Sequence, residues 1–127
     1  MDMPKMGAIG WLDLTVQDAE ATKDFYAAAC GWKPQPQYMG DYADFNMLDA
    51  DGNAVAGVCH ARGANINLPR MWMPYVVVAS LENAVAAAEE SGGTVLEKRV
   101  ESSGAGMAVV QDPAGACFAL WQFAPGV

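Results

Sequence analysis

Asp13 is the residue whose chemistry is least expected from its surroundings. It lies in the segment 11–16, whose second, fourth and sixth residues are aliphatic and whose others are Trp11, Asp13 and Thr15. This alternation predicts a strand with two different faces. A buried carboxylate is costly unless it is paired. Asp13 therefore predicts either a structural partner, such as a basic side chain or Tyr75, or a functional role as a countercharge or general base.

Other reactive side chains give weaker patterns. His60 is the single histidine and lies near a strand end, which favours an exposed, inert side chain over a general base. Strand alternation would send Cys59 and His60 to opposite faces, which disfavours a Cys–His dyad. The cysteines Cys30, Cys59 and Cys117 are odd in number and include no CxxC pair, so we expect no disulfide framework and three buried thiols.

Two stretches of the chain repeat one order of patterns about 62 residues apart. The first begins with strand 11–16 and the second with strand 73–78. Each strand is followed by a residue typical of helix starts, Asp18 or Ser80. The predicted helices cover residues 19–30 and 81–91. We expect the first helix to bury a stripe of small and aromatic residues: Ala21, Phe25, Ala28 and Ala29.

Each repeat continues with three short predicted strands. They cover residues 33–38, 44–48 and 54–59 in the first repeat, and 94–99, 107–111 and 116–123 in the second. The predicted fold is α+β, with two tandem βαβββ modules forming a curved mixed sheet around a cleft. Residues 1–127 are predicted to be one domain, with module 1 at about 7–61, a linker at 62–70 and module 2 at about 71–124.

Composition and charge restrict the class of partner. The net charge of −8, from 15 acidic and 7 basic side chains, argues against nucleic acid and against anionic membranes. It mainly favours solubility, and it also permits a cationic ligand. Residues 1–6 contain no apolar leader, and no apolar run approaches the ~20 residues of a membrane span. These features predict a cytoplasmic protein.

The order and duplication of these motifs resemble the vicinal oxygen chelate superfamily, which includes glyoxalase I, extradiol dioxygenases and bleomycin-resistance proteins. The similar pieces are Leu14-Thr15-Val16-Gln17-Asp18, Phe25-Tyr26, Gly31-Trp32, Asp112-Pro113-Ala114-Gly115 and Leu120-Trp121-Gln122. Trp72-x-x-Tyr75 and Phe118-Ala119-Leu120-Trp121-Gln122 are similar to a bacterial hydroxylase-like branch. The resemblance implies a homodimer.

Enzymes of the superfamily hold a divalent metal with four side chains, two from each module. The resemblance places these positions seven residues before the helix caps and seven residues after the turns that begin at Asp49 and Asp112. They fall on Trp11, Ala56, Met73 and Ala119. None of these can supply an oxygen or imidazole ligand. We therefore predict no metal and no other cofactor, which counts against glyoxalase or dioxygenase chemistry.

If these four positions face the cleft, their neighbours two residues away face it too. On this basis we expect the ligand-binding residues to be Trp11, Asp13, Met73, Tyr75, Trp121 and His60. Ala54, Ala56 and Val58 are expected on the same wall. Such a cleft is largely aromatic with few polar anchors, as in small-molecule pockets. Strand aromatics also commonly belong to a core, which is the alternative for Trp11, Tyr75 and Trp121.

These features predict a metal-free small-molecule-binding protein for a partly aromatic compound that can carry a positive charge, similar to the antibiotic-sequestering branch of the superfamily. The alternative is a lyase, oxygenase or hydroxylase-like enzyme of the same superfamily, with Asp13 or His60 as a general base. A third interpretation is a domain that acts mainly through assembly into a homodimer.

Overall fold

The computed structural model describes residues 5–125, which form two compact units. The N-terminal module consists of residues 11–72. The C-terminal module consists of residues 73–125 together with residues 5–10. Both boundaries between the modules, after residue 10 and after residue 72, lie inside strands.

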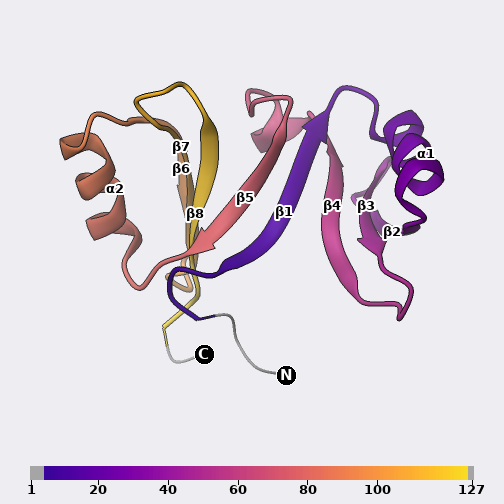
Figure 1. The fold of residues 1–127 in the computed structure, drawn as a ribbon, viewed down its shortest axis with the longest axis horizontal. Coiled ribbons are helices and arrows are strands. Elements are labelled where there is room, and N and C mark those ends of the chain that lie inside the picture. Colours follow the sequence, from indigo (N-terminus) through magenta and orange to yellow (C-terminus); the bar gives the residue numbers. More distant parts are fainter. Residues whose placement is uncertain (1–4, 126–127) are drawn as a thin grey trace. The chain divides into compact units, whose positions relative to one another are not determined.

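The N-terminal module has a βαβββ topology. Its elements are β1 (Ile9–Val16, from residue 11 on), α1 (Ala19–Cys30), β2 (Lys33–Tyr38), β3 (Ala43–Leu48), β4 (Ala54–His60) and the short 3-10 helix η1 (Gly63–Asn65). The strand order is β2-β3-β4-β1. Strands β1 and β4 are parallel and the other pairs are antiparallel, which makes the sheet mixed (Figure 1).

The C-terminal module repeats this topology. Its elements are β5 (Trp72–Val77, from residue 73 on), α2 (Leu81–Glu90), β6 (Thr94–Val100), β7 (Gly106–Gln111) and β8 (Cys117–Gln122). The strand order is β5-β8-β7-β6, with β5 and β8 parallel. Two residues from the beginning of the chain complete the module. Gly7 donates its backbone N–H to the carbonyl of Val77, and the carbonyl of Ala8 accepts the backbone N–H of Val77.

Local signals explain where the helices begin. The Asp18 side chain accepts the backbone N–H of Ala21 at 3.1 Å, and the Ser80 side chain accepts that of Asn83 at 3.1 Å. Both predicted caps are confirmed, as are the α+β class and the tandem βαβββ units. Within residues 5–125, no helix is long and apolar enough to span a membrane.

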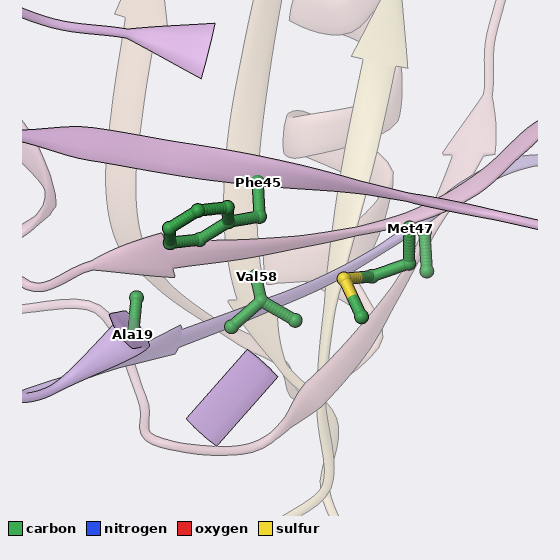
Figure 2. Close-up of a cluster of buried hydrophobic side chains, with 5 residues drawn as sticks. Ala19, Phe45, Met47 and Val58 are labelled. Carbon is green, nitrogen blue, oxygen red and sulfur yellow. The ribbon is translucent and has the colours of Figure 1, made fainter. Parts of the chain in front are cut away.

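Each helix covers one face of the strands in its own module. Ala19 of α1 packs in a buried cluster with side chains of β3 and β4 (Figure 2): Phe45, Met47, Ala56 and Val58. The corresponding cluster beside α2 consists of Leu81, Val85, Ala108, Val110 and Leu120. The opposite strand faces of each module are therefore the ones left for chemistry.

The predicted buried stripe of α1 is wrong. Phe25 is 64% exposed, and Ala21, Ala28 and Ala29 are also exposed. Tyr26 packs against the core instead. Its hydroxyl accepts the indole N–H of Trp72 at 2.9 Å, and its ring stacks 6.2 Å from that of Trp32. Such aromatic contacts bury more surface than alanine side chains can, and they fix the rotation of the helix.

Candidate functional site

The parallel pair β1 and β4 brings a carboxylate beside a glycine. Asp13 lies opposite Gly57 and Thr15 lies opposite Cys59. Paired residues project to the same face of a sheet, and so do residues two apart on one strand. A Cβ atom built on Gly57 would overlap Asp13 Oδ1 and would lie 3.3 Å from the Trp11 indole nitrogen. The glycine therefore provides the space that the carboxyl group occupies.

Two donors of the N-terminal module contact Asp13. The indole N–H of Trp11 donates to Asp13 Oδ1 at 3.1 Å. The thiol of Cys59 donates to the same oxygen, with Sγ at 3.7 Å. Neither contact uses Oδ2. Trp11 and Asp13, which the sequence analysis predicted as ligand-binding residues, are therefore brought together by a direct hydrogen bond.

Burial changes the ionisation of this pair. Loss of solvent raises the pKa of Asp13 from 3.8 to about 6, against the opposing effect of its hydrogen bonds from Trp11 and Cys59, and the nearby negative charge of Asp44 also raises it. No basic side chain is among these influences on its pKa. Burial, together with the charges of Asp13 and Asp44, raises the pKa of the Cys59 thiol well above its ordinary value. Cys59 is therefore a neutral donor at physiological pH.

Asp44 extends this polar group to the end of β4. Its Oδ1 accepts the backbone N–H of His60 at 2.8 Å and lies 3.4 Å from His60 Nδ1. Both side chains are largely buried, and the His60 ring makes an edge contact with Tyr42 at 5.4 Å. The prediction that His60 is exposed is wrong. Its predicted ligand contact stays a prediction.

The expected facing of β4 is also wrong. Gly57 and Cys59 share the face of Asp13, whereas Ala56 and Val58 lie in the cluster beneath α1. The expectation had placed the even-numbered residues of β4 on the wall with Asp13. Two side chains that were not predicted for the site, Cys59 and Asp44, are therefore the ones that influence the Asp13 carboxyl group.

A β-bulge is the physical reason for this difference. Met47 pairs with Ala56 and Leu48 pairs with Ala54, which leaves Val55 as an extra residue in β4. One extra residue reverses the facing of everything beyond it. In the C-terminal module the β7–β8 ladder is regular. Counting seven residues from Asp112, where the turn begins, therefore gives the correct position, Ala119, which lies opposite Tyr75.

The C-terminal module places aromatic side chains at the corresponding positions. Tyr75 of β5 and Trp121 of β8 make an edge contact with ring centroids 6.5 Å apart. Gly10 gives the Trp121 ring room, because a Cβ atom there would lie 3.0 Å from both that ring and Val77. Met73 begins the same face of β5 and is fully buried.

The four positions that the superfamily uses for metal ligands do not fit a divalent ion. Trp11, Met73 and Ala119 have no suitable donor atom, and the register replaces Ala56 by Gly57 as the counterpart of Ala119. In the part of the chain from 5 to 125, no three His, Cys, Asp or Glu side chains gather so that they could hold a metal ion. The residues at these four positions therefore do not form a divalent-metal site.

Some residues of the site could have been found from the sequence. Gly57 lies inside the apolar strand Ala54–His60, where a glycine often marks a close approach of another group. Cys59 was predicted as a buried apolar thiol, but it is only half-buried and its thiol contacts a carboxylate. Cys30, also predicted to be buried, is exposed. Nothing in the pattern of β3 distinguished Asp44.

The fold agrees with comparisons to known proteins. The family model described as "Glyoxalase-like domain" matches residues 11–121. The chain belongs to this family, and its predicted membership of the glyoxalase/bleomycin-resistance/dioxygenase superfamily is confirmed.

Two sequence relatives cover nearly all of the chain. "Putative glyoxylase CFP32" of Mycobacterium bovis is 32% identical over 124 residues, which is 93% of this chain and 46% of that protein. "Anthracycline biosynthesis protein DnrV" of Streptomyces peucetius is 29% identical over 129 residues, or 91% and 47%. The chain thus spans about half the length of the curated relatives it matches.

Two solved structures share the fold. A variant of Streptomyces coelicolor methylmalonyl-CoA epimerase, in complex with 2-nitronate-propionyl-CoA, has a TM-score of 0.54 at 18% identity and covers 94% of this chain and 99% of its own. A glyoxalase/bleomycin resistance protein/dioxygenase superfamily member from Vibrio splendidus has a TM-score of 0.58 at 14% identity, with coverage of 88% and 96%.

Proposed function

We propose that this glyoxalase-like protein binds a small, partly aromatic cation without a divalent metal, through the Asp13 face of the N-terminal module. One observation carries the proposal. Asp13 is partly buried, its pKa of about 6 leaves it ionised at neutral pH, and no basic side chain influences that pKa. A buried carboxylate without a cation is unfavourable, and a cationic ligand would offset that cost.

The neighbouring indole supports an aromatic cation. Trp11 donates its N–H to Asp13, so its ring lies beside the carboxylate. An indole face attracts a cation within about 6 Å, and it also stacks on aromatic rings. The net charge of −8 favours the approach of a cation and disfavours polyanions.

Matched probes test the proposal. Benzylamine, which is protonated at neutral pH, and the uncharged benzyl alcohol are titrated while NMR follows the indole N–H of Trp11. We expect benzylamine to bind at least about tenfold more tightly. Asp13→Asn should remove the difference, and Asp51→Asn, in an exposed turn, should keep it. Equal affinity of the two probes for the parent protein would overturn the proposal. Metal analysis of the purified protein tests the metal-free part, which stoichiometric metal would contradict.

A second candidate function is general-base catalysis by Asp13. The observation that favours it is the pKa of about 6, which is close to the value that suits proton abstraction near neutral pH. Phenylacetone in deuterated buffer offers an aromatic carbon acid. Exchange of its α-protons should increase through the titration of Asp13 and disappear in Asp13→Asn. A rate that does not change in this variant would exclude Asp13 as the base.

We also propose that the protein acts in the cytoplasm as a homodimer, without a nucleic-acid or membrane partner. The acidic composition supports the exclusion of polyanionic partners. The resemblance to the superfamily supports the dimer. Size-exclusion chromatography with light scattering tests the assembly, and a monomer at micromolar concentration would contradict it.

A further inference from the structure

The face of Asp13 carries one polar side chain, Thr15, whose oxygen has no hydrogen-bond partner among residues 5–125. The Thr15 side chain is fully buried, and its Oγ1 makes no hydrogen bond among the residues that the structure describes. Buried hydroxyl groups normally have a partner, and leaving one without a partner destabilises the protein. This atom therefore indicates a position where a ligand group or a water molecule would complete the site.

The strand register places this hydroxyl on the same face as the Asp13 carboxylate. Thr15 follows Asp13 by two residues on β1 and lies opposite Cys59. Side chains at this spacing start about 7 Å apart. Asp13 Oδ1 lies over Gly57 and accepts the Cys59 thiol, so the side chain opposite Thr15 contacts the carboxyl group. A charged and a neutral oxygen therefore lie on one face of the sheet, two residues apart along β1.

We propose that the group bound at this site is a primary or secondary ammonium, which donates one N–H to Asp13 and another to the Thr15 hydroxyl. This inference rests on the proposed function, which requires only a cation. An alkylammonium carries several donors around a compact charge and satisfies both oxygens. A quaternary ammonium has no N–H, so it would leave the hydroxyl without a partner and place methyl groups against it. The site therefore selects for N–H as well as for charge.

A methylation series tests this selectivity. Benzylamine, N-methylbenzylamine, N,N-dimethylbenzylamine and benzyltrimethylammonium carry the same ring and charge. We expect affinity for the parent protein to fall at least about tenfold from the first to the last. Thr15→Val should bring the four affinities close together, because its side chain has the same shape without the hydroxyl. Thr15→Ser should restore the preference. Thr94→Val, at an exposed position of β6, is the matched control and should keep the parent series.

The outcomes separate this inference from the proposed function. Equal binding of all four cations, lost in Asp13→Asn, would overturn the ammonium inference and leave the proposed function intact. Binding of none of the four cations would overturn both. The fold of Thr15→Val is checked by urea denaturation, where we expect an unchanged or higher midpoint, since the variant removes a hydroxyl without a partner. A clearly lower midpoint would indicate a structural bond and would contradict the inference.

Discussion

The two modules place different chemistry at the same point of the same topology. In each module the first strand pairs in parallel with the last strand. At the corresponding point of each ladder, one residue of the first strand lies opposite one residue of the last. In the N-terminal module the pair is Asp13 and Gly57, with a thiol donor nearby. In the C-terminal module the pair is Tyr75 and Ala119, with the Trp121 ring nearby.

The difference shows how one scaffold holds either a charge or a ring. Each arrangement depends on a glycine that makes space for the large group: Gly57 for the Asp13 carboxyl and Gly10 for the Trp121 ring. The contact at Gly57 is the tighter of the two, since a Cβ atom there would overlap a carboxyl oxygen. Substitution of Gly57, beside Asp13, should therefore lower the stability of the protein more than substitution beside the Tyr75–Trp121 pair.

The largest effect is expected from Gly57→Ala. The added methyl group must displace the Asp13 carboxyl and break its contact with Trp11, and overpacking of this kind costs about 2–3 kcal/mol of unfolding free energy. The reciprocal change Ala119→Gly removes a methyl group and should cost about 1 kcal/mol. Urea denaturation measures both. The comparison fails if Gly57→Ala is as stable as the parent protein.

Next in size is the pH dependence that Asp13 imposes. Its folded-state pKa of about 6 lies above the unfolded value of 3.8, so the folded state binds the proton more tightly. The cost of ionising Asp13 is therefore fully present above about pH 6 and disappears below about pH 4. When the pH is lowered from about 8 to about 4, the unfolding free energy of the parent protein should rise by roughly 2 kcal/mol relative to that of Asp13→Asn.

Urea denaturation across this pH range provides the measurement for both proteins. The exposed-turn variant Asp51→Asn is the control and should follow the parent protein. A constant difference between the parent protein and Asp13→Asn would show that Asp13 titrates normally in the folded state.

Cys59→Ala should change stability less than either Gly57→Ala or the titration of Asp13. The thiol hydrogen bond favours the ionised form of Asp13, so its loss should raise the pKa of Asp13 further and lower stability at neutral pH by about 1 kcal/mol. Carbon-13 NMR of the Asp13 carboxyl group follows the titration. Cys117→Ala, at a half-buried thiol of the C-terminal module, should leave that titration unchanged. An unchanged pKa in Cys59→Ala would argue against the thiol contact.

The smallest effect is expected from Asp44→Asn. The charge of Asp44 is the weakest of the influences on Asp13, and it raises the pKa. Its removal should therefore lower the pKa slightly, in the opposite direction to Cys59→Ala. The amide oxygen can still accept the backbone N–H of His60, so the strand end is retained. The same NMR titration detects the shift, and a rise in the pKa would contradict the assigned sign.

Local patterns predicted the elements well, because strand alternation and helix caps are encoded within a few residues. Asp18 and Ser80 begin helices as predicted, and the strands lie within a few residues of their expected bounds. The facing of β4 could not be predicted, because the extra residue Val55 becomes visible only through pairing with β3. The rotation of α1 likewise depends on contacts of Tyr26 with a tryptophan 46 residues away.

The same contrast between local patterns and long-range pairing explains why only part of the candidate site was predicted. Asp13 and Trp11 lie two residues apart, so their shared face follows from the strand pattern. Cys59 and Asp44 reach Asp13 only through long-range pairing. The strand pattern also predicts that Thr15 shares this face, but only the surrounding structure shows that its hydroxyl has no hydrogen-bond partner among the described residues.

The C-terminal module includes a short piece from the beginning of the chain, and this affects how the protein could be divided. Residues 5–10 belong with residues 73–125, and Gly7 and Ala8 bond to Val77. A single cut between residues 62 and 70 would therefore separate the C-terminal strands from part of their own module. The C-terminal fragment would lack residues 5–10 of its own module, so we expect it to require the N-terminal fragment to complete its fold, which makes the chain a natural subject for fragment complementation.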